Sequence, residues 1–372
     1  MQIPLSKPDI THLEKTYVMD VLNSGILSLG NKVIEFEEKF RNLLNVSYAV
    51  GMNSGTSALH VAVKALGLKE GDEVITSPYS FVASSNCLLF EGVKPVFVDV
   101  HPDTTVMDER LIEKAITDRT KAILVVHIFG HPCNMDEIVK IAKKFNLKII
   151  EDACEAIGAT WNGRLTGTFG DVSVFAFYPN KQITTGEGGM LVTNDEQIYN
   201  MAASLRNQGR SISNEWLSHE RLGYNYRLSD IHAAIGVAQM ERLPEILKKR
   251  EKVAEQYHKL INEYQVPVIY LKNHQHATIS WFVYPVLLPE YTNRDKVVEE
   301  LHKKGIQSKP YFPSIHLQPF YKDLFQTNDG DFPVCEMLAK RSLAIPFFND
   351  LSEKEQKYVM TTLLDIIKRD TQ

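Results

Sequence analysis

The first two-thirds of the chain alternates short apolar runs with stretches in which apolar residues recur at helical spacing. Each run has the length of a buried strand, and helical patterns separate most of them. This alternation is typical of α/β folds and predicts a mostly parallel sheet that helices cover on both faces. The predicted strands are Tyr48–Gly51, Glu73–Thr76, Pro95–Val100, Ala122–Ile128, Lys148–Asp152, Val172–Phe177 and Gly189–Thr193.

The pattern changes after a predicted helix over Asp230–Arg242, at the pair Leu243-Pro244. The chain is longer than a single hydrophobic core usually supports, and no repeat, low-complexity tract or Ser/Gly linker divides it. We therefore expect two domains packed together, a large domain of residues 1–242 and a smaller α+β domain of residues 243–372. The smaller domain is predicted to hold a long charged helix to about Glu263, a strand over Ile279–Leu288, and helices near Arg294–Lys304 and Ser352–Lys368.

Composition narrows the function classes. The 372 residues include 41 basic and 46 acidic side chains, interspersed along the chain, and the net charge is −5. This charge gives no electrostatic footprint for nucleic acid. No apolar run approaches the length of a membrane span, and the start, Met1–Leu5, lacks the basic and apolar regions of a secretion signal. We expect a cytoplasmic protein that binds neither nucleic acid nor membrane.

Cysteine and histidine spacing gives no metal signature. The cysteines lack CxxC spacing and are interpreted as reduced, mostly buried thiols, with Cys154 packed in the core. Two histidine pairs, His127 with His131 and His274 with His276, come without a third ligand at a recognisable spacing. No metal site is predicted. The four cysteines are Cys87, Cys133, Cys154 and Cys335.

One lysine stands in a glycine-rich turn between two apolar strands. The segment from Phe175 to Gly189 reads FAFYPNKQITTGEGG, and its lysine is Lys181. Because α/β sheets keep their active sites at strand ends, Lys181 is placed to act as a nucleophile toward an aldehyde. Taken alone, the segment fits a surface lysine in a hairpin better, and other segments reverse this preference.

A second segment, LKIIEDACEA from Leu147 to Ala156, ends an apolar strand on the carboxylate pair Glu151 and Asp152. Carboxylates at the carboxyl end of a parallel strand usually point into a ligand crevice. A lysine that reacts with pyridoxal phosphate needs a carboxylate that keeps the pyridine nitrogen protonated, so that the ring can accept electrons. The chain between Asp152 and Lys181 is long enough for a crossover and another strand, so both can reach one crevice. By itself, Asp152 could equally be a helix N-cap.

A third segment has the outline of a phosphate cradle. From Val50 to His60 the chain reads VGMNSGTSALH, a short strand, a turn rich in glycine and hydroxyl groups, and the start of a helix. A helix N-terminus offers backbone N–H groups to an anion, and Thr56 and Ser57 could add hydroxyl donors. The P-loop and GxGxxG patterns are missing, which disfavours nucleoside triphosphates and NAD. In isolation the segment fits simple helix capping slightly better.

Taken together, these segments resemble the nucleotide-sugar aminotransferases, the DegT-like branch of the fold type I pyridoxal-phosphate enzymes. The resemblance covers nearly the whole chain and implies an α/β fold type I transferase. The order and spacing of the matching segments make it specific. They are Asn23-Ser24-Gly25, Gly30, Phe36-Glu37, residues 53–59, Ser80-Phe81, Glu151-Asp152, the lysine segment, residues 206–209 and 223–230, Tyr311–Pro313 and His316–Pro319.

The resemblance implies a role for each matching residue. Lys181 binds the cofactor, pyridoxal 5′-phosphate, covalently, and Asp152 pairs with the pyridinium nitrogen. Gly55 and Thr56 hold the phosphate. Phe81 stacks its ring on the face of the cofactor; an ordinary core phenylalanine is the alternative.

The resemblance also implies a homodimer with shared active sites. Asn225 would reach the phosphate of the neighbouring subunit's cofactor, so that each site is completed by the other chain. Substrate-pocket residues are expected from Asn23–Gly30, the segment after Lys181, and Tyr311–His316.

Three positions depart from the family pattern. The serine that often precedes the lysine and contributes to the phosphate site is Ala176 here. Glu155 stands where many members have a glutamine near the cofactor's phenolic oxygen, and a carboxylate beside a phenolate is repulsive unless one of them is protonated. Gln208 replaces a common histidine. None of these changes removes the catalytic machinery.

The activity implied is a two-stage transamination that moves an amino group from an amino acid, expected to be L-glutamate, to a keto group of a nucleotide-linked sugar in amino-sugar and polysaccharide biosynthesis. A sugar dehydratase of the same fold would carry histidine in place of Lys181. A cofactor-binding regulator would need a DNA-binding extension for which the chain has no segment. An enzyme for free amino acids would need an arginine clamp in the small domain, and none is evident.

Overall fold

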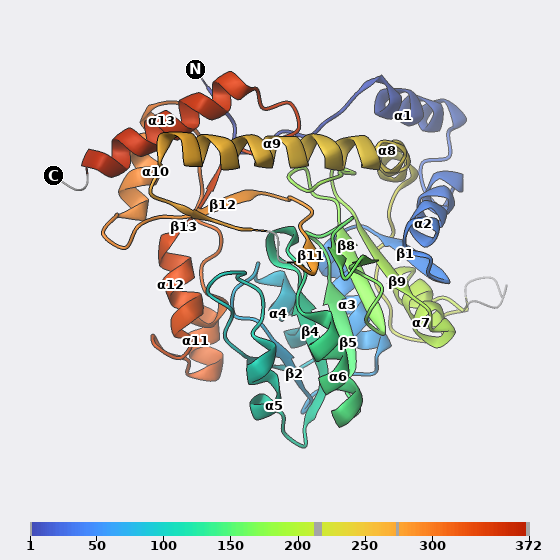
Figure 1. Cartoon of the computed structure of the whole chain (residues 1–372). Coiled ribbons are helices and arrows are strands. Elements are labelled where there is room, and N and C mark those ends of the chain that lie inside the picture. Colours follow the sequence, from blue (N-terminus) through green and yellow to red (C-terminus); the bar gives the residue numbers. More distant parts are fainter. Residues whose placement is uncertain (1, 212–217, 273–274, 370–372) are drawn as a thin grey trace.

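The computed structural model describes residues 2–211, 218–272 and 275–369 (Figure 1). At its centre lies a seven-stranded sheet with the strand order β1-β9-β8-β5-β4-β2-β3. β9 runs antiparallel to both of its neighbours, and the other neighbouring strands are parallel. The mostly parallel sheet predicted from the sequence is thus confirmed. Its strands are β1 Tyr48–Met52, β2 Glu73–Thr76, β3 Lys94–Phe97, β4 Thr120–Val126, β5 Lys148–Asp152, β8 Val172–Ala176 and β9 Gly189–Thr193.

The sheet is covered on both faces. Every residue of β2 and β9 is buried, and so is all of β4 except Lys121. Because successive side chains of a strand point to opposite faces, this burial requires cover on both sides. The helices in contact with the sheet are α2 Asn31–Leu44 on β1 and β9, α3 Gly55–Ala65 on β1, β5, β8 and β9, α4 Ala83–Leu89 on β2 and β3, α6 Met135–Phe145 on β5, and α7 Glu196–Arg206 on β1 and β9.

Helix α6 begins and ends where the sequence supplies caps. In α6, the Asn134 side chain accepts a hydrogen bond from the backbone N–H of Glu137 at the first turn. The helix ends at Asn146, which adopts the left-handed conformation that asparagine tolerates (φ 53°). Between the caps, Ile138 and Ile141 recur at helical spacing on the buried face.

A second, three-stranded antiparallel sheet forms beside the first, in the order β10-β12-β13. The long helix α9 runs from the region of the main sheet across to this second sheet (Figure 1). Among the described helices, none is both long and apolar enough to cross a membrane. The elements are β10 Ile269–Tyr270, β12 Tyr284–Leu287, β13 Ser342–Ile345, α8 Asp230–Glu241, α9 Leu243–Tyr264, α10 Arg294–Lys303, α11 Pro319–Phe325, α12 Pro333–Arg341 and α13 Glu353–Arg369.

Strand pairing joins the two parts of the chain. At the N-terminus, before α1 (His12–Ser24), Ile3 forms a bridge with Ile306. In a small third sheet, β11 (Ala277–Thr278) pairs with β6 (Thr160–Trp161), which pairs with β7 (Arg164–Leu165). The domain boundary after residue 242 stays a prediction.

The predicted strand Ile279–Leu288 is wrong in its first half, because only Tyr284–Leu287 is a strand. The backbone before it is bound elsewhere. The Ser280 N–H donates to the carbonyl of Gly130 (3.0 Å), and the Phe282 carbonyl accepts from the Arg250 guanidinium (2.6 Å). Long-range hydrogen bonds of this kind cannot be predicted from apolar periodicity.

Candidate active site

A cavity of about 590 Å³ opens at the carboxyl edge of the main sheet. This edge is where α/β proteins commonly bind ligands. Its walls come from the segments after β1, β2, β5 and β8 and from residues 282 and 310–313 of the second part of the chain. The lining residues are Ser54, Gly55, Thr56, Leu59, Ser80, Phe81, Ala83, Ser84, Val126, Asp152, Cys154, Glu155, Ala176, Tyr178, Asn180, Lys181, Glu187, Gly188, Phe282 and Pro310–Pro313.

The sheet topology brings the two main candidates together. Asp152 is the last residue of β5, which pairs in parallel with β8, so Asp152 lies opposite Val174. Lys181 follows β8 in the turn that leads back to β9. Both side chains therefore line the same cavity, as the sequence predicts.

Lys181 is held between a carboxylate and an aromatic ring. Its Nζ lies 3.1 Å from Oε1 of Glu155 and 4.0 Å from the ring centroid of Phe282. The Lys181 side chain is only 14% exposed. The amine is thus fixed on the cavity wall instead of extending into solvent.

Glu155 also accepts a hydrogen bond from the backbone. The N–H of Phe129 donates to its Oε2 at 2.8 Å. Burial raises the pKa of Glu155 above its ordinary value, although Lys181 and the Phe129 N–H both act to lower it. This carboxyl group is therefore easier to protonate than a surface glutamate.

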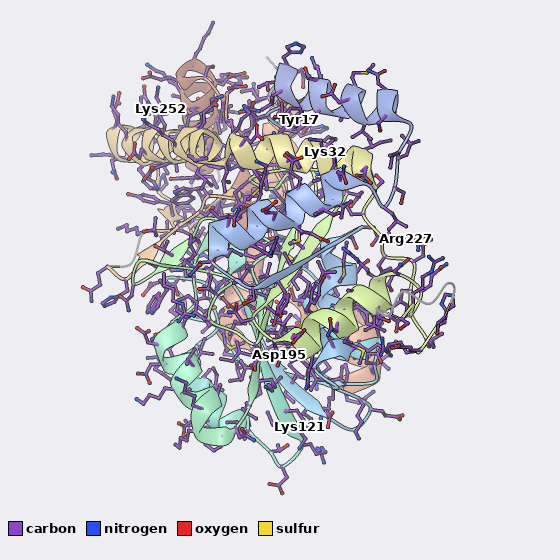
Figure 2. The ribbon with its side chains drawn as sticks, turned by 90° about the vertical axis from the view of Figure 1, so that its right-hand side faces the viewer. Tyr17, Lys32, Lys121, Asp195, Arg227 and Lys252 are labelled. Carbon is purple, nitrogen blue, oxygen red and sulfur yellow. The ribbon has the colours of Figure 1, made fainter. Side chains whose placement is uncertain are left out.

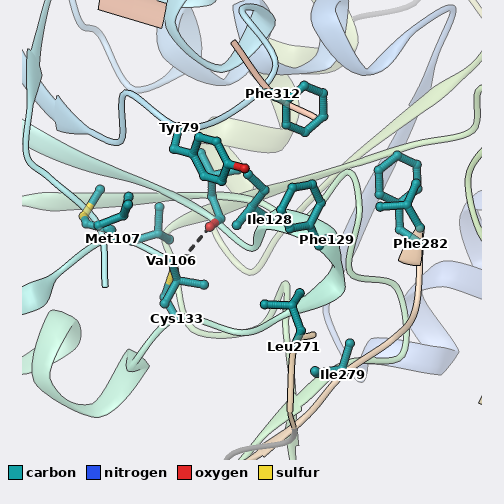
Figure 3. Packing of buried hydrophobic residues seen from close by; sticks show 14 of the residues in the cluster. Tyr79, Val106, Met107, Ile128, Phe129, Cys133, Leu271, Ile279, Phe282 and Phe312 are labelled. Carbon is teal, nitrogen blue, oxygen red and sulfur yellow. Dashed lines mark hydrogen bonds between the residues drawn. The ribbon is translucent and has the colours of Figure 1, made fainter. Parts of the chain in front are cut away.

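The turn that presents the Phe129 N–H has an unusual backbone. Phe129 is a bulky residue in the left-handed region (φ 58°), and Gly130 follows it with φ 81°. A Cβ on Gly130 would lie 1.8 Å from the carbonyl oxygen of Ser280, so only glycine fits. The Phe129 ring packs between Tyr79 and Phe312, with centroid distances of 6.0 and 5.7 Å (Figure 3).

Asp152 is fixed by a chain of hydroxyl groups. Ser84 donates to its Oδ2 at 2.7 Å, and the Ser84 hydroxyl in turn lies 2.8 Å from that of Ser80. The backbone N–H of Cys154 donates to the other carboxylate oxygen (3.2 Å). Asp152 itself is 5% exposed. The carboxylate is therefore rigidly oriented.

The start of α3 forms one end of the cavity. Ser54 caps the helix by accepting a hydrogen bond from the Ser57 N–H at 3.0 Å. The prediction that Ser57 offers its hydroxyl to an anion is wrong, because this hydroxyl donates to Asn53 (2.7 Å) and does not line the cavity. Gly55 and Thr56 do line it.

Gly55 lies against Ala176, the residue before the lysine turn. A Cβ on Gly55 would lie 2.6 Å from the Cβ of Ala176 and 3.2 Å from Sγ of Cys154. Position 55 therefore has no room for a side chain. The thiol of Cys154 packs against the core and also lines the cavity, so its predicted role as core packing is incomplete.

Two further predicted residues differ in position. Phe81 lines the cavity with a ring that is 57% exposed, 6.4 Å from the ring of Phe312. Asn225 is exposed and does not line the cavity of its own chain. Of the predicted pocket segments, Tyr311–Pro313 line the cavity, whereas Asn23–Gly30 and His316 do not.

Sequence reasoning missed Ser84, Phe282 and the backbone N–H of Phe129. Ser84 lies four residues after Ser80, both are buried, and two hydroxyl groups at this spacing are a signal that could have been used. Phe282 could not be found, because it reaches the cavity from the second part of the chain.

Histidine and carboxylate groups elsewhere have partners within the protein. His127 accepts the N–H of Cys133 at Nδ1 and contacts Glu151 through Nε2 (both 3.1 Å). Within the described ranges, His101, Asp108 and Glu109 lie close enough to hold a cation. Arg110 already binds Asp108 through two nitrogens, and His101 binds Glu109 at 2.8 Å. His274 lies outside the described residues.

Comparison with known proteins agrees with this geometry. Residues 8–364 match the model of the DegT/DnrJ/EryC1/StrS aminotransferase family. GDP-perosamine synthase of Escherichia coli O157:H7 is 39% identical over 97% of both chains. The putative pyridoxal phosphate-dependent aminotransferase EpsN of Bacillus subtilis is 34% identical over 98% of this chain and 96% of its own length.

Among solved structures, Helicobacter pylori PseC, an aminotransferase involved in the biosynthesis of pseudoaminic acid, has a TM-score of 0.94 at 30% identity, covering 99% of this chain and 100% of PseC. The similarity to these proteins, in sequence and in structure, therefore extends over nearly the whole chain. The chain belongs to the DegT/DnrJ/EryC1/StrS aminotransferase family and is a pyridoxal-phosphate-dependent aminotransferase.

Proposed function

We propose that the protein transfers the amino group of an amino acid, L-glutamate, to a keto group of a nucleotide-linked sugar and so makes an amino sugar for polysaccharide synthesis. The names of two relatives, GDP-perosamine synthase and PseC of the pseudoaminic acid pathway, support a sugar acceptor. The observation that carries the proposal is the meeting of Lys181, Asp152 and the start of α3 in one cavity.

The residues of this cavity fit pyridoxal phosphate. Lys181 offers a held amine for the aldehyde, and Asp152 offers a fixed carboxylate for the pyridine nitrogen. Gly55 and Thr56 offer the N-terminus of α3 to the phosphate, at a point where a Cβ on residue 55 would clash. The exposed ring of Phe81 offers a stacking surface.

When bound, the cofactor supplies an electron sink for the carbanion at the donor's α carbon. Lys181 acts as the acid and base of the reaction. Its amine removes the proton from the α carbon of the amino donor and later delivers a proton to the sugar carbon that receives nitrogen. The carboxylate of Asp152 keeps the ring nitrogen protonated throughout.

Glu155 replaces the family's glutamine with a group that can itself carry a proton. Burial raises its pKa, so the side chain takes up a proton more readily than a surface glutamate, and only the protonated form could donate a hydrogen bond to the phenolic oxygen as a glutamine amide would. Glu155 also contacts Lys181 at 3.1 Å, so it orients the amine.

Asn225 acts in the cofactor site of a second copy of the chain, and the active protein is a homodimer. Two observations support this part of the proposal. The Asn225 side chain is exposed, and it is absent from the lining of its own cavity. With Ala176 in place of a serine, each site has one phosphate donor fewer of its own, so the donor from the other chain matters more.

The competing activities fit less well. A sugar dehydratase of this fold would have histidine where this chain has Lys181. An enzyme for free amino acids would clamp the substrate carboxylate with arginine. Among the described residues that line the cavity, Lys181 is the only cation, and Asp152, Glu155 and Glu187 are carboxylates.

The decisive experiment incubates the purified protein with glutamate, pyridoxal phosphate and a panel of nucleotide-linked 4-keto and 3-keto sugars, and identifies products by mass spectrometry. The expected product is an amino sugar with 2-oxoglutarate in equal amount. Formation of 2-oxoglutarate with none of the sugars aminated, while free keto acids are aminated, would overturn the proposed acceptor.

The dimer is tested by mixing Lys181→Ala, which is expected to be inactive, with Asn225→Ala, which is expected to release pyridoxal phosphate on dilution. In a heterodimer, the intact Lys181 belongs to the Asn225→Ala chain and receives its asparagine from the other chain. Up to about half the activity of the wild-type dimer is expected by this count of sites. Heterodimers confirmed by mass spectrometry that stay inactive would contradict the role of Asn225.

A further inference from the structure

The segment around Asn225 is extended and its side chains alternate in direction. The N–H groups of Tyr224 and Tyr226 donate to the carbonyls of Leu205 (2.7 Å) and Arg206 (2.9 Å). The two tyrosines are partly buried, whereas Asn225 between them is exposed. Figure 2 shows Arg227, two residues further on, at the edge of the face that carries Tyr17 and Lys32.

Both tyrosines are tied down at their hydroxyl ends. The Tyr224 hydroxyl donates to Oε1 of Glu91 at 3.1 Å, and the Tyr226 hydroxyl lies 3.2 Å from Nδ1 of His60. His60 contacts the same oxygen of Glu91 through Nε2 at 2.7 Å. The two tyrosine rings stack on each other with centroids 4.8 Å apart and planes 13° apart. One hydrogen-bonded network thus holds the residues on both sides of Asn225.

The hydrogen bonds of this network are mutually consistent. Burial lowers the pKa of His60, although Glu91 acts to raise it. Neutral His60 can donate from Nε2 to Glu91 and accept the Tyr226 hydroxyl at Nδ1. The second oxygen of Glu91 accepts from Lys64 at 2.7 Å. Each polar end of the network therefore has a partner.

The backbone of the segment is fixed by the turn before α3 as well. Asn53, in the turn just before α3, donates from its N–H to the Tyr226 carbonyl (2.9 Å) and from its side-chain amide to the Asn225 carbonyl (3.4 Å). His60 lies on α3 itself, the helix whose first turn lines the cavity. The segment is thus braced by the turn before α3 and by α3 itself.

We propose that Tyr224 and Tyr226, anchored by Glu91 and His60, are positioning residues that hold Asn225 outward in the geometry needed to complete the cofactor site of a second copy of the chain. This inference rests on the proposed homodimer. A single bond from Asn225 gains affinity only if its carrier is rigid before binding, because ordering a mobile segment would offset the gain. The tyrosine network supplies this rigidity.

The test measures pyridoxal phosphate affinity by equilibrium titration of the full-length dimer. Replacing both tyrosines by phenylalanine, Tyr224→Phe with Tyr226→Phe, keeps the stacked rings and removes only the hydroxyl anchors. Two lost hydroxyl bonds should weaken cofactor binding by about 10-fold, and by no more than Asn225→Ala does. The matched control is Tyr358→Phe on the distant helix α13. This change removes one hydrogen bond from the Tyr358 hydroxyl to the Lys304 carbonyl and should leave the cofactor affinity unchanged.

A double-mutant cycle separates positioning from general destabilisation. In the Asn225→Ala background, the two phenylalanine changes should cause no further loss, because the residue they position is gone. The loss should also act on the other subunit. In a heterodimer of the double phenylalanine chain with a Lys181→Ala chain, the one intact lysine belongs to the phenylalanine chain and receives Asn225 from the Lys181→Ala chain. This site should bind cofactor with wild-type affinity. Circular dichroism checks that each variant folds, and the single phenylalanine variants replace the pair if it does not.

Other outcomes overturn the inference in distinct ways. An equal loss in the presence and absence of Asn225 would mean that the tyrosines only stabilise the fold. Wild-type affinity of the tyrosine pair, with Asn225→Ala weakened, would refute the positioning role and leave the homodimer proposal intact. Wild-type affinity of Asn225→Ala itself would overturn the shared site, and the positioning role with it.

Discussion

Two buried carboxylates that are close in sequence, Glu151 and Glu155, face opposite surroundings. Glu151 is the penultimate residue of β5, is fully buried, and lies in a nest of donors. Glu155 is also buried but lies on the wall of the cavity and accepts from one backbone N–H and the Lys181 amine. The donors to Glu151 are His127 (3.1 Å), the backbone N–H groups of Gly167 (2.8 Å), Phe169 (2.6 Å) and Gly170 (2.7 Å), and the Ser173 hydroxyl (3.1 Å).

The surroundings move the two pKa values in opposite directions. Burial by itself would raise the pKa of Glu151, but the bonds from His127 and the backbone N–H groups outweigh it and lower the pKa. For Glu155, burial prevails and the pKa is raised. Burial alone therefore does not distinguish a structural carboxylate from a reactive one. The number of hydrogen-bond donors that face each carboxylate distinguishes the two.

The largest expected effect on activity comes from removing Lys181, the residue that contacts Glu155 in the cavity. Lys181→Ala should lower turnover by roughly 10⁴-fold or more, because both the covalent attachment and the proton transfer are lost. Cofactor should remain only noncovalently bound. Borohydride reduction followed by peptide mass spectrometry locates the attachment in the wild type, and trapping on a lysine other than Lys181 would refute the assignment.

Asp152→Asn is expected to have the next largest effect. The asparagine can still accept from Ser84, so the fold should stay intact, but it cannot keep the ring nitrogen protonated. Turnover should fall by several orders of magnitude with little change in melting temperature. Near-normal turnover, with cofactor occupancy verified by absorbance, would exclude the role.

Glu151→Gln is expected to lower stability and leave turnover nearly unchanged, the opposite of Asp152→Asn. The amide group of glutamine would face N–H groups with a donor of its own, which leaves buried donors without acceptors and should reduce the free energy of unfolding by about 3 kcal/mol. Activity per folded molecule should stay close to wild type. Chemical denaturation measures the change, and Glu113→Gln, which breaks an exposed pair with Lys144, is the control with an expected loss below about 1 kcal/mol.

The smallest expected effect is a difference in pH dependence. Glu155 has a folded pKa raised above the ordinary 4.5, so its contribution to stability is present below pH 4.5 and is lost as pH rises through the folded value. Glu151 has a lowered folded pKa, so its contribution is present above pH 4.5 and is lost as pH falls through the folded value.

Unfolding free energies of the wild type, Glu155→Gln and Glu151→Gln, measured across acidic to neutral pH, should show this contrast. The advantage of wild type over Glu155→Gln should shrink as pH rises, and its advantage over Glu151→Gln should grow. Difference curves with the same sign of slope would mean that the two carboxylates are not distinct in the way described.

The sequence predicted the sheet and the main cavity residues because both follow from local patterns. Apolar runs of strand length define β4 and β5, and a carboxylate or lysine at a strand end falls at the carboxyl edge once the strands are parallel. The contrast between Glu151 and Glu155 could not be predicted. The donors to Glu151 include backbone N–H groups in the loop of residues 167–170. Because every residue except proline carries such a donor, residue types do not reveal which of them face a carboxylate.

Long-range contacts set the same limit elsewhere. Phe282 reaches the cavity from the second part of the chain, and its strand-like pattern predicted pairing where the Phe282 carbonyl instead accepts from Arg250. The role of Ser57 was missed because a hydroxyl near a helix start can serve an anion or a neighbouring side chain, and Asn53 decides the matter here.

The close approach of Gly55 and Ala176 restricts the order in which this site can change. A Cβ on residue 55 would lie 2.6 Å from that of Ala176, whereas the next neighbour, Sγ of Cys154, lies at 3.2 Å. Gly55→Ala should therefore be damaging by itself and tolerated only after Ala176→Gly. Any lineage that acquires a side chain at position 55 must first pass through a sequence that has lost the one at position 176.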